Sequence, residues 1–174
     1  MILQFPIFWT PIGIDFSISK EICFPIHSRK QSRELRRYHM SEIFESVEDL
    51  RVHADIYNER LVVTSGGFDP MHVGHLRCLL DSAEFVRKVG GRTKLAVIVN
   101  SDGFLLRKKG YAFMPAEERM EIIAGVKGVD YVVPWDDGGQ TVTGALAVLK
   151  PFAFTKGGDR DAAANVPELS CVRG

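Results

Sequence analysis

The 174-residue sequence lacks several features that would place a protein in a special class. Its three cysteines, Cys23, Cys78 and Cys171, lie far apart, so they form neither a disulfide framework nor a CxxC metal site. No apolar run approaches the roughly 20 residues that cross a membrane. Basic and acidic side chains balance at 22 each, so no positive field favours nucleic acid. These absences predict a cytoplasmic protein without a membrane or nucleic-acid partner.

The first 39 residues differ in composition from the rest of the chain. Their apolar start is interrupted by Pro6 and Pro11 and has no lysine or arginine before it, so it is a poor secretory signal. We expect residues 1–39 to form an irregular or disordered extension. There are two alternatives for these residues: they form a targeting or docking tail, or translation begins at Met40 and they are not part of the natural protein. Residues 40–174 are expected to form one domain with its core at 60–160.

Strand and helix patterns alternate in the expected domain. Short apolar, β-branched runs predict strands at residues 61–65, 94–100, 129–135 and 151–155. Helices are predicted at 41–57 with Ser41 as the cap, at 72–89, from Pro115 onward, and at 141–149. Residues 101–113 are predicted to be a polar loop. This alternation predicts an α/β fold, a Rossmann-like parallel sheet with flanking helices.

The segment Gly66 to His75, GGFDPMHVGH, follows the first predicted strand and opens a predicted helix. Glycines after a strand let the backbone approach a ligand, and a helix start offers N–H groups to a phosphate. His72 and His75 are three residues apart, so both can face one point. Such a pair could also bind zinc, but no third ligand has a convincing local spacing. The pattern therefore favours a phosphate site.

This segment resembles the HxGH signature of the cytidylyltransferase-like nucleotidyltransferase superfamily, and the similarity runs from about Leu61 to Arg160. Two branches are most similar: glycerol-3-phosphate cytidylyltransferase and the heptose-phosphate adenylyltransferase domain. The run AVIVNSDGFLLRKKG resembles both branches. The later run PAEERMEIIAGVKGVDYVVPW, followed by FTKGGD, resembles the heptose branch more.

The resemblance implies roles for residues at three strand ends. His72, His75 and Lys108 would be catalytic, with the histidines on the α- and β-phosphate oxygens. Nucleotide binding would fall to Gly66, Gly67, Phe68, Asp69, Gly74, Lys156, Gly157, Gly158 and Asp159. Asp69 would shape its loop, and Gly74 would leave room for the nucleotide. Arg107, Lys109 and Arg119 are candidates for the acceptor phosphate, although Arg119 could equally form a surface ion pair.

The implied reaction transfers a nucleoside monophosphate from ATP or CTP, with Mg²⁺, to a sugar phosphate or polyol phosphate and releases pyrophosphate. A homodimer is also implied. The family's second motif, a serine- and threonine-rich sequence that opens a final helix, has no counterpart before Gly174, which predicts a C-terminally truncated or degenerate member. The alternative is a non-catalytic nucleotide-binding module. A class I aminoacyl-tRNA synthetase fragment is less favoured, because the chain is neutral and has no KMSKS-like segment.

Overall fold

The structure is a computed structural model that describes residues 41–157. The predictions for residues 1–39 and for the C-terminal segment, including Gly158 and Asp159, lie outside the described residues.

Within the described residues, five parallel strands form one sheet in the order β1-β4-β3-β2-β5. The strands are β1 (Glu42–Ile43), β2 (Arg60–Gly66), β3 (Thr93–Asn100), β4 (Tyr131–Trp135) and β5 (Ala153–Thr155). The longest pairing joins β2 to β3, from Arg60 opposite Thr93 to Gly66 opposite Val99. Because all pairs are parallel, the carboxyl ends of the strands meet at one edge, where α/β sheets bind their ligands.

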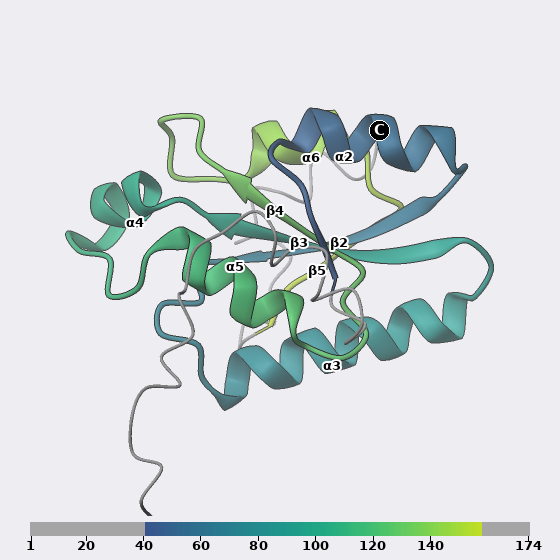
Figure 1. Cartoon of the computed structure of the whole chain (residues 1–174), viewed down its shortest axis with the longest axis horizontal. Coiled ribbons are helices and arrows are strands. Elements are labelled where there is room, and N and C mark those ends of the chain that lie inside the picture. Colours follow the sequence, from purple (N-terminus) through teal and green to yellow (C-terminus); the bar gives the residue numbers. More distant parts are fainter. Residues whose placement is uncertain (1–40, 158–174) are drawn as a thin grey trace, which may run out of the picture. The chain divides into compact units, whose positions relative to one another are not determined.

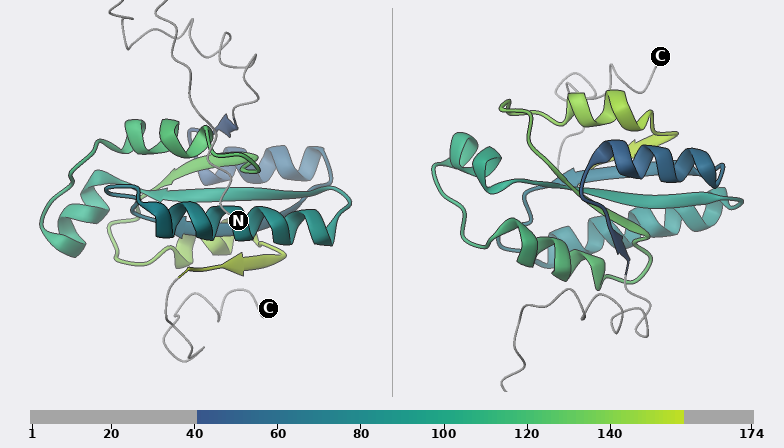
Figure 2. Two further views of the ribbon diagram at one scale, coloured as in Figure 1. Left: turned by 90° about the horizontal axis from the view of Figure 1, so that it is seen from below. Right: turned by 45° about the horizontal axis from the view of Figure 1, so that its top comes forward.

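Two helices cover each face of the sheet (Figures 1 and 2). Helices α2 (Val47–Ile56) and α6 (Thr143–Leu149) pack on one face, and α3 (Val73–Val89) and α5 (Ala116–Ala124) pack on the other. Buried side chains of β2, β3 and β4 alternate between the two cores. None of the helices within residues 41–157 has the length and apolar character needed to span a bilayer. The predicted Rossmann-like α/β fold is confirmed.

The predicted helix over residues 41–57 is wrong in its first third. Residues Glu42–Ile43 instead form the edge strand β1, which pairs with Tyr131 and Val132 of β4. Ser41 does not cap a helix; its Oγ donates to the backbone oxygens of Ala124 and Val129. Helix α2 begins only at Val47, and Ser46 is its cap.

The predicted polar loop over residues 101–113 is also wrong in its first part. Residues Asp102–Lys109 form helix α4, which extends beyond the carboxyl edge of the sheet (Figure 1). Ser101 caps its start by accepting the N–H of Phe104, and Gly110 ends it in the left-handed region at φ 84°. The three cations at 107–109 therefore occupy the last turn of a helix.

A buried guanidinium connects the segments beyond β2 and β3. Arg119 of α5 is 1% exposed and donates to the backbone oxygens of Gly67 and Asn100, at 2.7 Å each. It also donates to the backbone oxygen of Met114 and to the carboxylate of Asp102. The ion pair expected as one alternative for Arg119 is present, with the partly exposed Asp102, but the guanidinium itself is buried and not at the surface. Contact of Arg119 with an acceptor phosphate stays a prediction. Its role in the fold is to position strand ends.

We expect Arg119→Met to lower the free energy of unfolding by about 3–5 kcal/mol, because three backbone oxygens and a carboxylate lose their donor. Arg107→Met is the matched control. Arg107 pairs with Asp136 in a partly exposed ion pair, so its loss should cost about 1 kcal/mol or less. Urea unfolding measures both values. Equal losses in the two variants would show that Arg119 has no special structural role.

Candidate functional site

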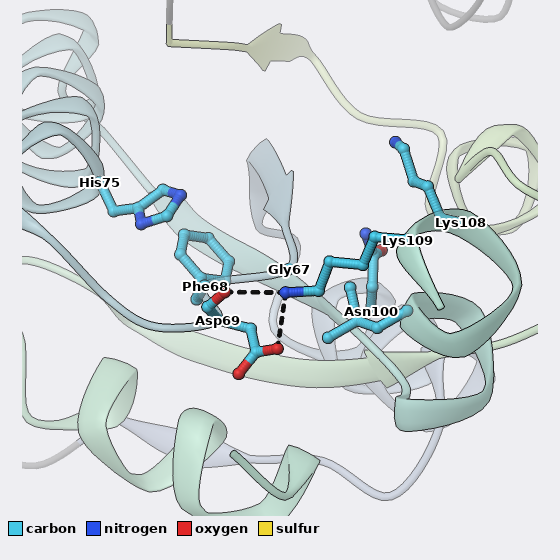
Figure 3. A pocket seen from close by; sticks show the side chains of 8 residues that line it. Gly67, Phe68, Asp69, His75, Asn100, Lys108 and Lys109 are labelled. Carbon is cyan, nitrogen blue, oxygen red and sulfur yellow. Dashed lines mark hydrogen bonds and ion pairs between the residues drawn. The ribbon is translucent and has the colours of Figure 1, made fainter. Parts of the chain in front are cut away.

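A pocket of about 260 Å³ lies at the carboxyl ends of β2 and β3 (Figure 3). Residues from the loop after β2, the start of α3, the end of β3 and helix α4 contribute to it. They are Gly67, Phe68, Asp69, His75, Asn100, Leu105, Lys108 and Lys109. The pocket thus brings together residues from two of the three strand ends at which the resemblance implied site residues, the glycine-rich motif and the region of the three cations.

Asp69 organises the loop that forms one wall of the pocket. Its carboxylate accepts the backbone N–H groups of Phe113 and Met114 at 2.8 and 2.7 Å, and the ammonium of Lys109 at 2.7 Å. Burial alone would raise the pKa of Asp69, but Lys109 and the two N–H donors outweigh it and hold that pKa below 3.8. Asp69 therefore stays ionised and shapes the loop, which agrees with the role implied by the resemblance.

The two histidines of the motif form a reciprocal cap at the start of α3. His72 is the cap residue, and its Nδ1 accepts the N–H of Gly74 at 3.1 Å. His75 Nδ1 accepts the N–H of His72 at 3.4 Å. The two rings stack with their centroids 3.8 Å apart, and Phe68 contacts His75 edge-on at 5.1 Å. The predicted proximity of the two imidazoles is confirmed.

This cap fixes the protonation pattern of the rings. Because each Nδ1 accepts a hydrogen bond, each neutral imidazole carries its proton on Nε2 and offers it as a donor. Burial, together with the neighbouring His72, holds the pKa of His75 below its usual 6.5. The site therefore presents a neutral N–H donor from His75 near pH 7, and the donor orientation is set before a ligand arrives.

Two glycines of the motif make room for protein side chains. A Cβ at Gly74 would lie 2.9 Å from Cε1 of His72, and a Cβ at Gly67 would lie 2.9 Å from Leu105. The expected purpose of Gly74, space for a nucleotide, is thus at least partly taken by the His72 ring. Phe68 adopts φ 51°, a strained value for a bulky residue, while its ring is buried against His75.

The three cations at 107–109 have different partners. The Lys109 ammonium donates to the Asp69 carboxylate and to the Asp69 backbone oxygen, so its charge is compensated. Arg107 pairs with Asp136 and does not line the pocket. Lys108 lines the pocket and has no carboxylate within ion-pair distance among residues 41–157. Lys109 lines the pocket with its charge paired, and Arg107 lies outside the pocket, so their expected contact with the acceptor phosphate stays a prediction.

The segment after β5 lies at the same edge of the sheet but not in the pocket. Lys156 Nζ sits over the ring of Phe154 at 5.9 Å, and a Cβ at Gly157 would meet Cys78 of α3 at 2.9 Å. Contact of Lys156 and Gly157 with a nucleotide stays a prediction, as does that of Gly66, which packs beside Phe68.

Two pocket residues, Asn100 and Leu105, were not predicted from the sequence. Leu105 falls within the segment that was expected to be a loop. Asn100 ends strand β3, and its polar side chain closes an otherwise apolar run. That position, a polar residue at the carboxyl end of a buried parallel strand, was the signal that could have identified it.

No cluster of three His, Cys, Asp or Glu side chains suited to a metal ion occurs within residues 41–157.

Comparison with known proteins agrees with this geometry. The family model described as cytidylyltransferase-like matches residues 63–167. The bifunctional protein HldE of Hahella chejuensis is 41% identical over 119 residues, which cover 66% of this chain and 23% of the relative. HldE of Pseudomonas syringae pv. syringae is 35% identical over 133 residues, covering 75% and 26%. The chain thus spans about a quarter of the length of these relatives.

A solved structure, the lipopolysaccharide core biosynthesis protein from Thermoplasma volcanium, is also similar. It has 24% sequence identity and a TM-score of 0.46, and the match covers 55% of this chain and 71% of that chain. The family model alone matches more than half of the sequence and includes the motif that builds the pocket. The chain therefore belongs to the cytidylyltransferase-like family of nucleotidyltransferases.

Proposed function

We propose that this protein transfers a nucleoside monophosphate from ATP or CTP to a small sugar phosphate or polyol phosphate and releases pyrophosphate. The reciprocal cap formed by His72 and His75 carries the proposal. It presents two Nε2–H donors at the start of α3, beside a pocket lined by Lys108, whose ammonium has no carboxylate partner among residues 41–157. Imidazole N–H donors together with a positive charge suit a phosphoryl group in transfer.

The proposed step needs no covalent intermediate and no general base. An oxygen of the acceptor phosphate attacks the α-phosphorus, and a new P–O bond forms. The bond from the α-phosphorus to the bridging oxygen breaks, and pyrophosphate leaves with that electron pair. The imidazole N–H groups donate to the phosphate oxygens on which negative charge accumulates. Lys108 would neutralise one of the reacting phosphates.

Magnesium fits this scheme as a partner of the triphosphate. Because Mg²⁺ is commonly held by substrate phosphates and waters, we expect it to enter bound to the nucleotide. When bound, it would screen the triphosphate charge and favour departure of pyrophosphate. The protein would contribute orientation and hydrogen-bond donors.

The resemblance to the heptose-phosphate branch favours a sugar phosphate over a polyol phosphate as the acceptor. The run from Pro115 to Trp135, followed by FTKGGD, resembles that branch more than the glycerol branch. A non-catalytic nucleotide-binding module that keeps the histidine pair and the pocket is the second candidate. The homodimer and the cytoplasmic location stay predictions.

Pyrophosphate release, measured with ATP and with CTP against three acceptors, tests the proposal. The acceptors are heptose 1-phosphate, mannose 1-phosphate and glycerol 3-phosphate, and one nucleotide–acceptor pair should release pyrophosphate in a Mg²⁺-dependent way. The product should contain acceptor and nucleoside monophosphate in equal amounts. Nucleotide binding without pyrophosphate from any pair would establish the binding module instead.

We expect His72→Ala and His75→Ala each to lower kcat by about 100-fold or more, because each removes a donor to the developing charge. His72→Asn is the matched control for folding, since asparagine is a good helix cap and retains a side-chain acceptor for the N–H of Gly74. This variant should keep the wild-type free energy of unfolding within about 1 kcal/mol and still lose turnover. If His72→Asn kept a near-normal kcat, His72 would have no catalytic role and would serve only as the helix cap.

Acidification should selectively remove the stabilising contribution of His75. Its folded-state pKa lies below 6.5, so its contribution is complete at pH values above 6.5 and is lost as the pH falls through the folded-state pKa. The proton enters at Nδ1, which then can no longer accept the His72 N–H. The stability advantage of the wild type over His75→Asn should therefore shrink between pH 7.5 and pH 5. Urea unfolding at each pH measures it; an advantage that grows on acidification contradicts the assignment.

A further inference from the structure

One polar atom at the edge of the sheet has no partner. The side-chain oxygen Oδ1 of Asn100 is buried without a hydrogen bond, and it is the one such side-chain atom among residues 41–157. The whole residue is only 7% exposed. Burial of a hydrogen-bond acceptor without a donor costs free energy, because the contact with water is lost and no other hydrogen bond replaces it. A leucine at this position would avoid that cost. We therefore expect the amide oxygen to accept a hydrogen bond from a ligand.

Asn100 is held at the pocket. It lies at the end of β3, its backbone oxygen accepts from Arg119 at 2.7 Å, and its side chain lines the pocket. In Figure 3 it lies on the same side of the pocket as Lys108 and Lys109, across from His75. The terminal torsion of asparagine is broad, so the amide can turn Oδ1 toward a ligand at low cost while the backbone stays fixed.

The position of the pocket indicates which reactant Asn100 meets. The pocket extends from the end of β2 toward β3 and α4, while β5 pairs with β2 on its other side. Its volume of about 260 Å³ falls just below the roughly 300–1,000 Å³ of common ligand pockets. A small reactant suits this space better than a whole nucleotide does. Lys108 provides a site for an anion in the same pocket.

We propose that Asn100 accepts a hydrogen bond from a hydroxyl group of the acceptor substrate, next to the phosphate that Lys108 binds. This inference rests on the proposed function and narrows it. The acceptor is then a phosphate ester that carries a hydroxyl group close to its phosphate. Asn100 acts as a specificity residue that distinguishes such compounds from their deoxy counterparts, because only a hydroxyl donor pairs the buried oxygen.

Calorimetric titration without nucleotide tests the inference independently of turnover. The probes are glycerol 3-phosphate against propyl phosphate, and glucose 1-phosphate against 2-deoxyglucose 1-phosphate. For at least one pair, the wild type should bind the hydroxylated compound about tenfold more tightly. Asn100→Ala should bring this ratio to about one. A purely structural effect would weaken both members of the pair equally and leave the ratio unchanged.

Two further variants separate the contributions. Lys108→Ala should weaken both members of a pair and keep their ratio, because it removes the anion contact alone. Asn100→Asp retains an acceptor oxygen, so the preference for the hydroxylated compound should persist although the added negative charge weakens both. This variant also keeps the test valid if Asn100→Ala folds poorly.

Three outcomes would overturn the inference. In the first, no tested phosphate ester binds. In the second, the wild type does not prefer the hydroxylated compounds, or Asn100→Ala keeps the preference. In the third, Asn100→Ala instead abolishes a preference for ATP over 2′-deoxy-ATP or 3′-deoxy-ATP, which would assign Asn100 to the ribose. Hydroxyl-dependent binding without pyrophosphate release in any assay would leave this inference standing and refute the proposed function.

Discussion

Two buried charged side chains, Arg119 and Asp69, fix the positions of the segments at the carboxyl edge of the sheet. The guanidinium of Arg119 joins the backbone after β2 to the end of β3, and the carboxylate of Asp69 fixes the chain that leads into α5. Each is satisfied by several hydrogen bonds, so a shift of one segment would leave charged groups without partners in the interior. The pocket is consequently built before any ligand binds, which is what transfer of a phosphoryl group by positioning requires.

The sequence predicted those elements whose hydrophobic pattern is strong. Strands β2, β3 and β4 are short β-branched runs, and α3 begins at a capping residue and ends at glycine. The errors occurred where stability comes from elsewhere. Helix α4 has little apolar periodicity and depends on caps at Ser101 and Gly110. Strand β1 has two residues, and its partner Tyr131 lies 89 positions away, so no local pattern could reveal it.

The site was predictable to the extent that its residues are adjacent in the sequence. The motif from Gly66 to His75 correctly predicted that the two imidazoles lie close together, because cap and helix geometry are local. The different roles of the basic residues were not predicted, because they depend on partners that are distant in the sequence. These partners are Asp69 for Lys109, Asp136 for Arg107, and the strand ends for Arg119. A count of charges could not indicate which of them stays available to a ligand. Asn100 was not predicted as a site residue, because what distinguishes it is a buried side-chain oxygen without a hydrogen bond, and a sequence does not reveal that.

Lys108 and Lys109 are adjacent and chemically identical, but their side chains have different contacts. Successive residues on an α-helix point about 100° apart, so the last turn of α4 directs one ammonium to Asp69 and leaves the other without a carboxylate partner in the described region. Two variants that each replace one of these lysines by the same neutral residue have the same composition and net charge. The variant at 109 would release the loop held by Asp69, and the variant at 108 would remove the cation from the pocket. Register along the helix, more than the amount of positive charge, is therefore the property that relatives of this chain would have to share.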